Sequence, residues 1–206
     1  MKFYLSSYKL GDRVGELTQL INGLPKRAVY IPNALDFASD LERRQKSEDG
    51  DLSELSVLGL GIERVDLRDY FGKKDELKEK LSACGLIYVR GGNVFVLRQA
   101  MKLSGFDDIL KEISSRNDLV YGGYSAGACV LAPSLRGAEL VDDISVFPYE
   151  ANDRVIWEGL GLISYAILPH FRSDHPESAA MEKVLEFYIS SKIPFVALKD
   201  GEVLIF

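Results

Sequence analysis

A serine inside a glycine-flanked run is the residue of this sequence best placed to do chemistry. The run Gly123-Tyr124-Ser125-Ala126-Gly127 follows the apolar stretch LVYGGY and leads into the small residues AGAC. The G-x-S-x-G pattern is typical of a nucleophile on a sharp strand-to-helix turn, where glycines let the two elements approach closely. A helix that starts at Ala126 directs unpaired N–H groups at the reaction centre, so the Ala126 N–H is a natural oxyanion donor. We therefore predict that Ser125 is the nucleophile of a serine hydrolase.

A serine nucleophile needs a base, and the chain has only two histidines, His170 and His175. His170 ends the apolar stretch YAILPH, which places it at the C-terminal end of a strand, where sites form in parallel sheets. His175 lies in a polar loop, and we expect it to be solvated. The spacing of His170, Asp174 and His175 matches no usual set of metal ligands, so we expect neither a metal nor a cofactor.

The base in turn needs an orienting acid. Asp200 follows the strand-like stretch PFVAL, again at the C-terminal edge of the predicted sheet, and is our preferred partner for His170. The main alternatives lie between the serine and the histidine in the chain: Glu139, Asp142, Asp143 and Glu150.

A second strand-to-helix junction carries the run Arg90-Gly91-Gly92-Asn93. Paired glycines at a helix N-terminus expose backbone N–H groups and favour an anion. We interpret this loop as the second half of an oxyanion hole, and we expect Asn93 to cap the following helix.

The rest of the chain alternates short apolar stretches with amphipathic ones. This rhythm predicts an α/β fold with a doubly wound, mostly parallel sheet and helices on both faces. We expect the acidic, glycine-containing run at 47–51 to break a long helix over 35–60. Residues 1–206 fit one domain. The expected strands are 2–6, 28–31, 62–66, 86–90, 119–124, 165–168, 195–198 and 202–206, and the other expected helices are 11–22, 75–83, 93–104, 106–115 and 177–190.

The composition of the chain narrows the classes of binding partner to expect. The net charge of −6 gives no reason to expect binding to nucleic acid or to an anionic membrane, since both favour basic patches. We see no signal peptide and no stretch long enough to cross a bilayer. Cys84 and Cys129 form no C-x-x-C pair and are expected to be free thiols in a reducing compartment, which favours the cytoplasm. We leave the oligomeric state open, with a homodimer among the options.

Taken together, these motifs resemble the peptidase E family of serine peptidases, the aspartyl dipeptidase family that also contains cyanophycinase. The similarity spans nearly the whole chain and keeps the order of its elements. The matching stretches are GGNVF at 91–95, GYSAGA at 123–128, PHF at 169–171 and LKDG at 198–201. In the last of these stretches, peptidase E has a glutamate before the glycine where this chain has Asp200.

The resemblance implies a fold like that of class I glutamine amidotransferases. It also implies a serine peptidase that hydrolyses short peptides through an acyl-enzyme, with a triad of Ser125, His170 and Asp200 and an oxyanion hole from Gly92 and Ala126. An alternative view of the family places the triad acid in the segment after the serine helix, and in this chain that acid would be Glu139 or Asp142.

The substrate is less closely defined by the resemblance. We assign Gly91, Asn93 and Arg172 to substrate binding. The family's arginine for an N-terminal aspartate has no counterpart at 178–181, so we expect a different peptide preference. Two other hypotheses stay open: an esterase or amidase on non-peptide acyl groups, and a non-catalytic binding protein on the same fold.

Overall fold

The central element is one mostly parallel sheet. In residues 1–151 and 154–206, which the computed structural model describes, six strands pair in the order β3-β2-β4-β5-β1-β8. All neighbours are parallel except β8, which runs antiparallel to β1. The strands are short and mostly buried, as the predicted apolar stretches require. They are β1 Lys2–Ser6, β2 Arg27–Ile31, β3 Gly61–Arg64, β4 Leu86–Val89, β5 Val120–Tyr124 and β8 Val203–Ile205.

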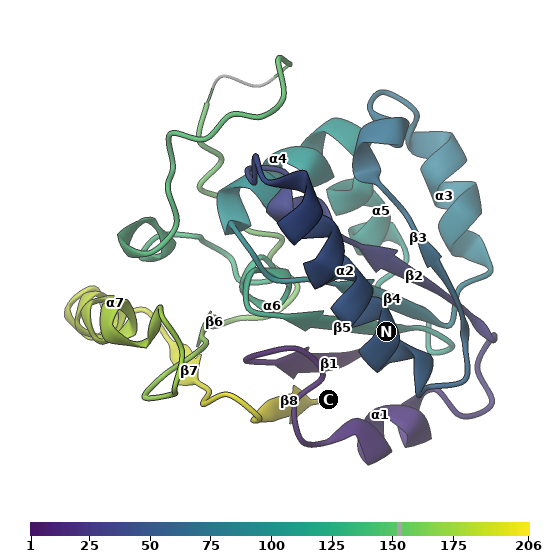
Figure 1. Cartoon of the computed structure of the whole chain (residues 1–206), viewed down its shortest axis with the longest axis horizontal. Coiled ribbons are helices and arrows are strands. Elements are labelled where there is room, and N and C mark those ends of the chain that lie inside the picture. The colour runs from purple at the N-terminus through teal and green to yellow at the C-terminus, as the bar shows by residue number, and fades with distance from the viewer. Residues whose placement is uncertain (152–153) are drawn as a thin grey trace.

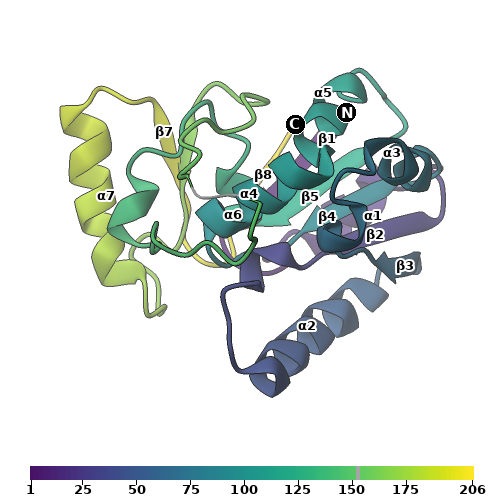
Figure 2. The ribbon, with the colours of Figure 1, turned by 90° about the horizontal axis from the view of Figure 1, so that it is seen from above.

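Helices cover both faces of this sheet (Figures 1 and 2), so the doubly wound α/β prediction is confirmed. One face packs against α3, α4, α5 and α6, and the other against α1 and α2. Short 3-10 helices span Asn33–Leu35, Leu67–Tyr70 and Ala138–Leu140. The α-helices are α1 Val14–Leu20, α2 Leu41–Ser56, α3 Lys74–Ser82, α4 Val94–Ser104, α5 Phe106–Glu112, α6 Ala126–Cys129 and α7 Ser178–Ser190.

Two further strands stand apart from the main sheet. β6 Ala166–Leu168 and β7 Phe195–Ala197 pair with each other in parallel and pack against α7 through their own apolar cluster. Figure 1 shows this unit beside the ends of β1 and β5. Expecting one sheet for all strands was wrong, because these two strands bury their side chains against α7.

The predicted break at 47–51 was also wrong, because α2 runs through it without interruption. Two of its acidic residues, Glu48 and Asp51, are buried and paired, whereas Asp49 is exposed. Glu48 bonds to Arg44 and Arg64 at 2.8 and 2.7 Å, and Asp51 accepts from the Tyr30 hydroxyl at 2.7 Å. These tertiary contacts outweigh the weak helix propensity of the run.

None of the helices in the described part of the chain combines the length and the hydropathy that a transmembrane span requires.

Candidate active site

Ser125 lies at the junction of β5 and α6 with a strained backbone. Its φ is 47° and its ψ −118°, a conformation that a residue with a side chain adopts only when its surroundings hold it. The packing around it is close. A Cβ on Gly123 would lie 2.7 Å from the Gly127 carbonyl oxygen, and one on Gly127 would lie 2.1 Å from that of Val89. The glycines thus let strand and helix meet, as the motif predicts.

Neither the Gly92 nor the Ala126 backbone N–H, both beside Ser125, has an acceptor among the described residues. Gly92 has a φ of 141°, and a Cβ there would lie 2.4 Å from the Ala34 carbonyl oxygen, so only glycine fits. Ala126 begins α6, where the first N–H groups of a helix are free. Both amides are therefore available to an anionic oxygen.

His170 and Asp200 form a hydrogen-bonded pair, with 2.7 Å between Nδ1 and Oδ1. Their loops follow β6 and β7, which pair with Leu168 opposite Ala197, so the register brings the two residues together. His170 is only 1% exposed, and this burial lowers its pKa, while the hydrogen bond to Asp200 opposes the shift. With Nδ1–H donated to Asp200, Nε2 of the neutral ring is left to accept a proton.

Ser7, directly after β1, joins the two parts of the site, and no motif in the sequence points to it. Its hydroxyl donates to Asp200 Oδ1 at 2.8 Å and accepts from the His170 backbone N–H at 2.7 Å. The preceding residue, Ser6, accepts from the Ser125 backbone N–H at 3.3 Å. One strand end therefore fixes the serine turn and the histidine loop together.

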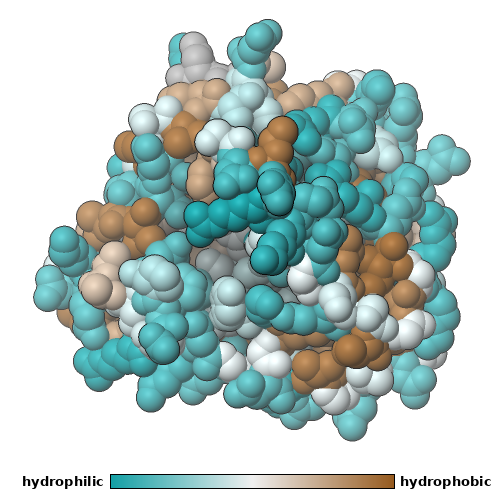
Figure 3. Space-filling model, in the orientation of Figure 1, coloured by the Kyte–Doolittle hydropathy of each residue, from teal (hydrophilic) through white to brown (hydrophobic). Residues whose placement is uncertain are grey.

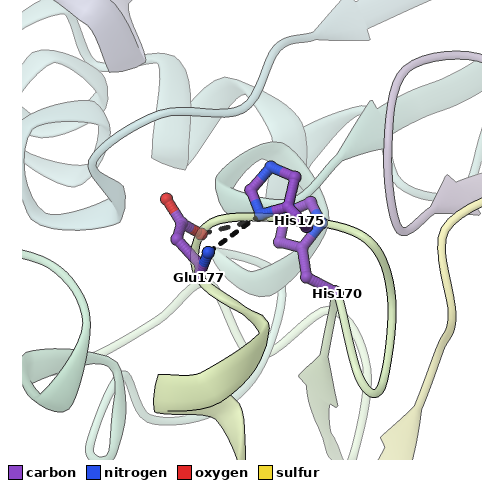
Figure 4. Close-up of side chains that lie close together, drawn as sticks. All are labelled: His170, His175 and Glu177. Atoms are coloured by element: carbon purple, nitrogen blue, oxygen red, sulfur yellow. Dashed lines mark hydrogen bonds and ion pairs between the residues drawn. The ribbon is translucent and has the colours of Figure 1, made fainter.

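His175 is half-buried rather than solvated. Its ring stacks on that of His170 (Figure 4), with centroids 3.7 Å apart and planes 8° apart. Tyr8 contacts both rings edge-on. Glu177 lies beside them, with Oε2 3.9 Å from His170 Nε2.

Ligand atoms of His170, His175 and Glu177 lie within 4.8 Å of one another, a group that the sequence did not single out. Two parallel stacked rings direct their lone pairs side by side, however, and zinc requires ligands that converge tetrahedrally. Of the two Nδ1 atoms, one bonds to Asp200 and the other accepts from the Glu177 backbone N–H. This geometry is that of a packed histidine pair.

Two cavities meet at Ser125. In the space-filling view this face of the molecule is hollowed near the ends of β1 and β5 (Figure 3). The apolar cavity has a volume of about 40 Å³, and its walls include Val94, Cys129, Leu168, Met181 and Tyr188. The polar cavity has a volume of about 120 Å³, and its walls include Lys9, Asp51, Arg90, Tyr124, His170 and His175. Gly92, Ser125 and Glu177 belong to both.

The alternative acids lie elsewhere. Glu139 accepts from the Gly137 backbone N–H at 2.5 Å, and Asp142 accepts from that of Val94 at 2.7 Å. Asp142 faces the apolar cavity, where burial raises its pKa to about 7. Asp143 and Glu150 are exposed. Among the described residues, the carboxylate on His170 Nδ1 is that of Asp200.

The residues expected to bind substrate fall in different places. Gly91 lines the polar cavity, and a Cβ on it would lie 2.9 Å from the Ser125 Cβ. Asn93 caps α4, as predicted, and its Nδ2 donates to a backbone carbonyl, so its side chain supports the loop. Arg172 is exposed, pairs with Glu182 at 3.0 Å and lines neither cavity.

A serine on a strained strand-to-helix turn, with two free amides beside it and a buried histidine nearby, defines the class of an α/β serine hydrolase. The chain belongs to peptidase family S51, whose model matches residues 6–206, and it is a serine peptidase. The peptidase E resemblance and the enzyme class inferred from the sequence are thereby confirmed.

Relatives agree with this assignment. An uncharacterized peptidase, Lmo0363, of Listeria monocytogenes is 30% identical over 93% of this chain and 87% of its own length. Peptidase E of Streptomyces coelicolor is 30% identical over 66% of this chain and 54% of its own. The crystal structure of a putative peptidase E protein from Listeria monocytogenes EGD-e superposes with a TM-score of 0.72 at 25% identity, covering 100% of this chain and 97% of that one.

Proposed function

We propose that this serine peptidase is an exopeptidase or dipeptidase for short peptides, with Ser125 as nucleophile, His170 as base and Asp200 as the orienting acid. One observation carries the proposal. The strained serine and a buried histidine line the same polar cavity, and the histidine ring is held by a carboxylate at 2.7 Å.

The chemistry follows from these positions. The Ser125 oxygen attacks the scissile carbonyl carbon while His170 Nε2 takes the hydroxyl proton. The C–N bond then breaks, and the leaving amine receives that proton from His170, which leaves an acyl-serine that water hydrolyses by the same route. Asp200 keeps the ring in the tautomer that has Nε2 free.

The two free backbone amides supply electrostatic stabilisation of the transition state. As the carbonyl becomes tetrahedral, its oxygen gains negative charge. The N–H groups of Gly92 and Ala126 can stabilise this charge, because both residues line a cavity together with Ser125. Each such donor is worth roughly 3 kcal/mol in comparable oxyanion holes. Neither amide has a competing acceptor among the described residues.

The apolar cavity supports an uncharged side chain on the acyl residue. Its volume of about 40 Å³ has room for roughly three water molecules or a small aliphatic side chain. The carboxyl groups that line it are those of Asp142 and Glu177, and no arginine or lysine is among the described residues there. A relative from Drosophila melanogaster is named a probable alpha-aspartyl dipeptidase. An aspartyl side chain would meet two carboxyl groups and no cation in this cavity, so we propose a leucyl-type rather than an aspartyl preference.

Ser125→Ala tests the nucleophile. We expect it to abolish both peptide hydrolysis and covalent labelling by a fluorophosphonate, while Ser56→Ala, at an exposed position in α2, keeps both. Hydrolysis that persists undiminished in Ser125→Ala would rule out the assignment.

A substrate panel tests the class. Leucyl and aspartyl dipeptides, together with short p-nitrophenyl esters, separate the proposed preference from aspartyl specificity and from esterase activity. We expect kcat/KM to be highest for the leucyl dipeptides. A preference for the aspartyl series would show that the apolar cavity does not hold the acyl side chain.

A further inference from the structure

Arg90 is a buried cation with unused hydrogen-bonding capacity. It directly follows β4 and precedes the glycine loop, and it is 5% exposed. Its Nη1 has no hydrogen-bond partner among the described residues. A buried guanidinium nitrogen without an acceptor is costly, so its retention points to a partner that arrives with the substrate.

The remaining nitrogens of Arg90 fix the side chain in place. Nε donates to the Gly91 carbonyl at 3.1 Å, and Nη2 bonds to Ser47 Oγ at 3.2 Å and to the Tyr124 hydroxyl at 3.0 Å. These contacts come from the oxyanion loop, from α2 and from the residue before the nucleophile. The guanidinium is thus held rigidly next to the reacting serine.

Asp51 lies beside Arg90 but leaves it room for another anion. Its Oδ2 is 3.5 Å from Nε and already accepts from the Tyr30 and Tyr124 hydroxyls at 2.7 and 2.9 Å. The ion pair with Asp51 therefore involves Nε and does not occupy Nη1.

The polar cavity lies on the leaving-group side of the scissile bond. His170 must protonate the leaving amine, and among the two cavities that meet at Ser125 His170 lines only the polar one. Arg90 and Lys9 line the same cavity, and Lys9 is paired with Glu54. Of these two cations, Arg90 is the buried one, and it has a nitrogen without an acceptor among the described residues.

We infer that Arg90 binds a carboxylate of the leaving residue, and that the enzyme therefore selects substrates with an acid group one residue beyond the scissile bond. This inference rests on the proposed function, because it takes the polar cavity as the leaving-group side. The carboxylate has two sources, the C-terminus of a dipeptide or an acidic side chain on the leaving residue. Two carboxylates line this cavity. Glu177 lies beside His170 and disfavours an anion there, whereas Asp51 lies beside Arg90 and already accepts from two tyrosine hydroxyls. The cavity therefore accommodates an anion better at the Arg90 end.

The test compares leucyl-alanine with leucyl-alanine amide in each enzyme variant. For the unsubstituted enzyme we expect kcat/KM to favour the free acid by about 10- to 100-fold, the value of a charge-assisted hydrogen bond. Arg90→Met should bring this ratio close to one, and Arg90→Lys should restore part of it. Because the ratio is taken within one protein preparation, it does not depend on how much of a variant folds. Arg43→Met, which removes an exposed cation from the same helix as Ser47, should keep the original ratio.

A second pair of substrates separates the two sources. Leucyl-glutamate amide against leucyl-glutamine amide tests the side-chain carboxylate, with the terminal one blocked in both. A preference confined to the first comparison assigns Arg90 to the C-terminus, and a preference confined to the second assigns it to the side chain.

A binding measurement tests this inference separately from the catalytic proposal. Calorimetric titration of Ser125→Ala with leucyl-alanine and its amide measures recognition without turnover, so it gives an answer even if Ser125 is not the nucleophile. Tighter binding of the acid, lost in the Ser125→Ala, Arg90→Met double variant, supports the inference. Equal binding of acid and amide, absence of binding by both, or an acid preference that survives Arg90→Met would overturn it.

Discussion

The two halves of the active site stand on different parts of the fold. Ser125 and Gly92 follow the two middle strands of the main sheet, β5 and β4, where close backbone contacts leave no room for a side chain on the flanking glycines. His170 and Asp200 follow the short strands of a separate pair, β6 and β7. The first half is held by backbone packing and the second by side-chain hydrogen bonds, so substitutions should damage them in different ways.

The largest effect on stability is expected in the tightly packed half. Gly127→Ala places a Cβ about 2.1 Å from the Val89 carbonyl oxygen, a backbone atom that cannot move aside. We expect a loss of roughly 1–3 kcal/mol or more in the free energy of unfolding, seen as a lower Tm. Gly15→Ala in α1 is the matched control, since a Cβ there meets nothing within 4 Å. Equal melting of the two variants would contradict the packing account.

Asp200→Asn should spare stability and remove activity. A side-chain amide that is hydrogen-bonded to His170 Nδ1 can stabilise the wrong imidazole tautomer. In a comparable triad this change lowers kcat by roughly 10⁴-fold. We expect a loss of that order with a small change in Tm. Asp174→Asn, at an exposed position in the loop that follows His170, should leave kcat unchanged. A fully active Asp200→Asn enzyme would return the choice of acid to the 139–142 segment.

A smaller effect is expected where the two halves join. Ser7→Ala removes the hydroxyl between His170 and Asp200, and leaving a buried N–H without an acceptor costs about 1–3 kcal/mol. We expect kcat to fall by roughly ten- to a hundredfold with little change in KM. Ser7→Thr retains a hydroxyl and should recover part of the loss. A change in KM alone would place Ser7 in substrate binding instead.

The smallest effect concerns pH. Burial lowers the pKa of His170, and a protonated His175 stacked on it acts in the same direction. His170 works as a base when neutral, so the acid limb of kcat/KM should lie below the ordinary histidine pKa of about 6.5. His175→Gln removes the neighbouring charge and should move this limb to higher pH. An unchanged or lower midpoint in a pH–rate profile would contradict the coupling.

Local features of this site could be predicted from the sequence. The serine turn, the glycine loop and the Asn93 cap each depend on residues within a few positions of one another, and their types are dictated by steric and hydrogen-bonding needs. His170 was identified because the chain offers few histidines and one of them follows an apolar strand.

Long-range features could not be predicted in this way. Ser7 meets Asp200 across 193 positions of the chain, and the Arg90 contact with Ser47 depends on a helix expected to break there. The apolar strand periodicity also could not show that β6 and β7 leave the main sheet, because that depends on the apolar face of α7. These contacts arise from packing, which a pattern along the chain does not record.

The most direct test of the account is whether the two halves act as one catalytic unit. Residual kcat should be measured for Ser125→Ala, His170→Ala and the double variant, with Tm as a check on folding. If the serine acts through the histidine, removing either one removes the function of both, and the double variant should be no slower than the slower single variant. Losses that multiply in the double variant would show that Ser125 and His170 act independently and would contradict the proposed mechanism.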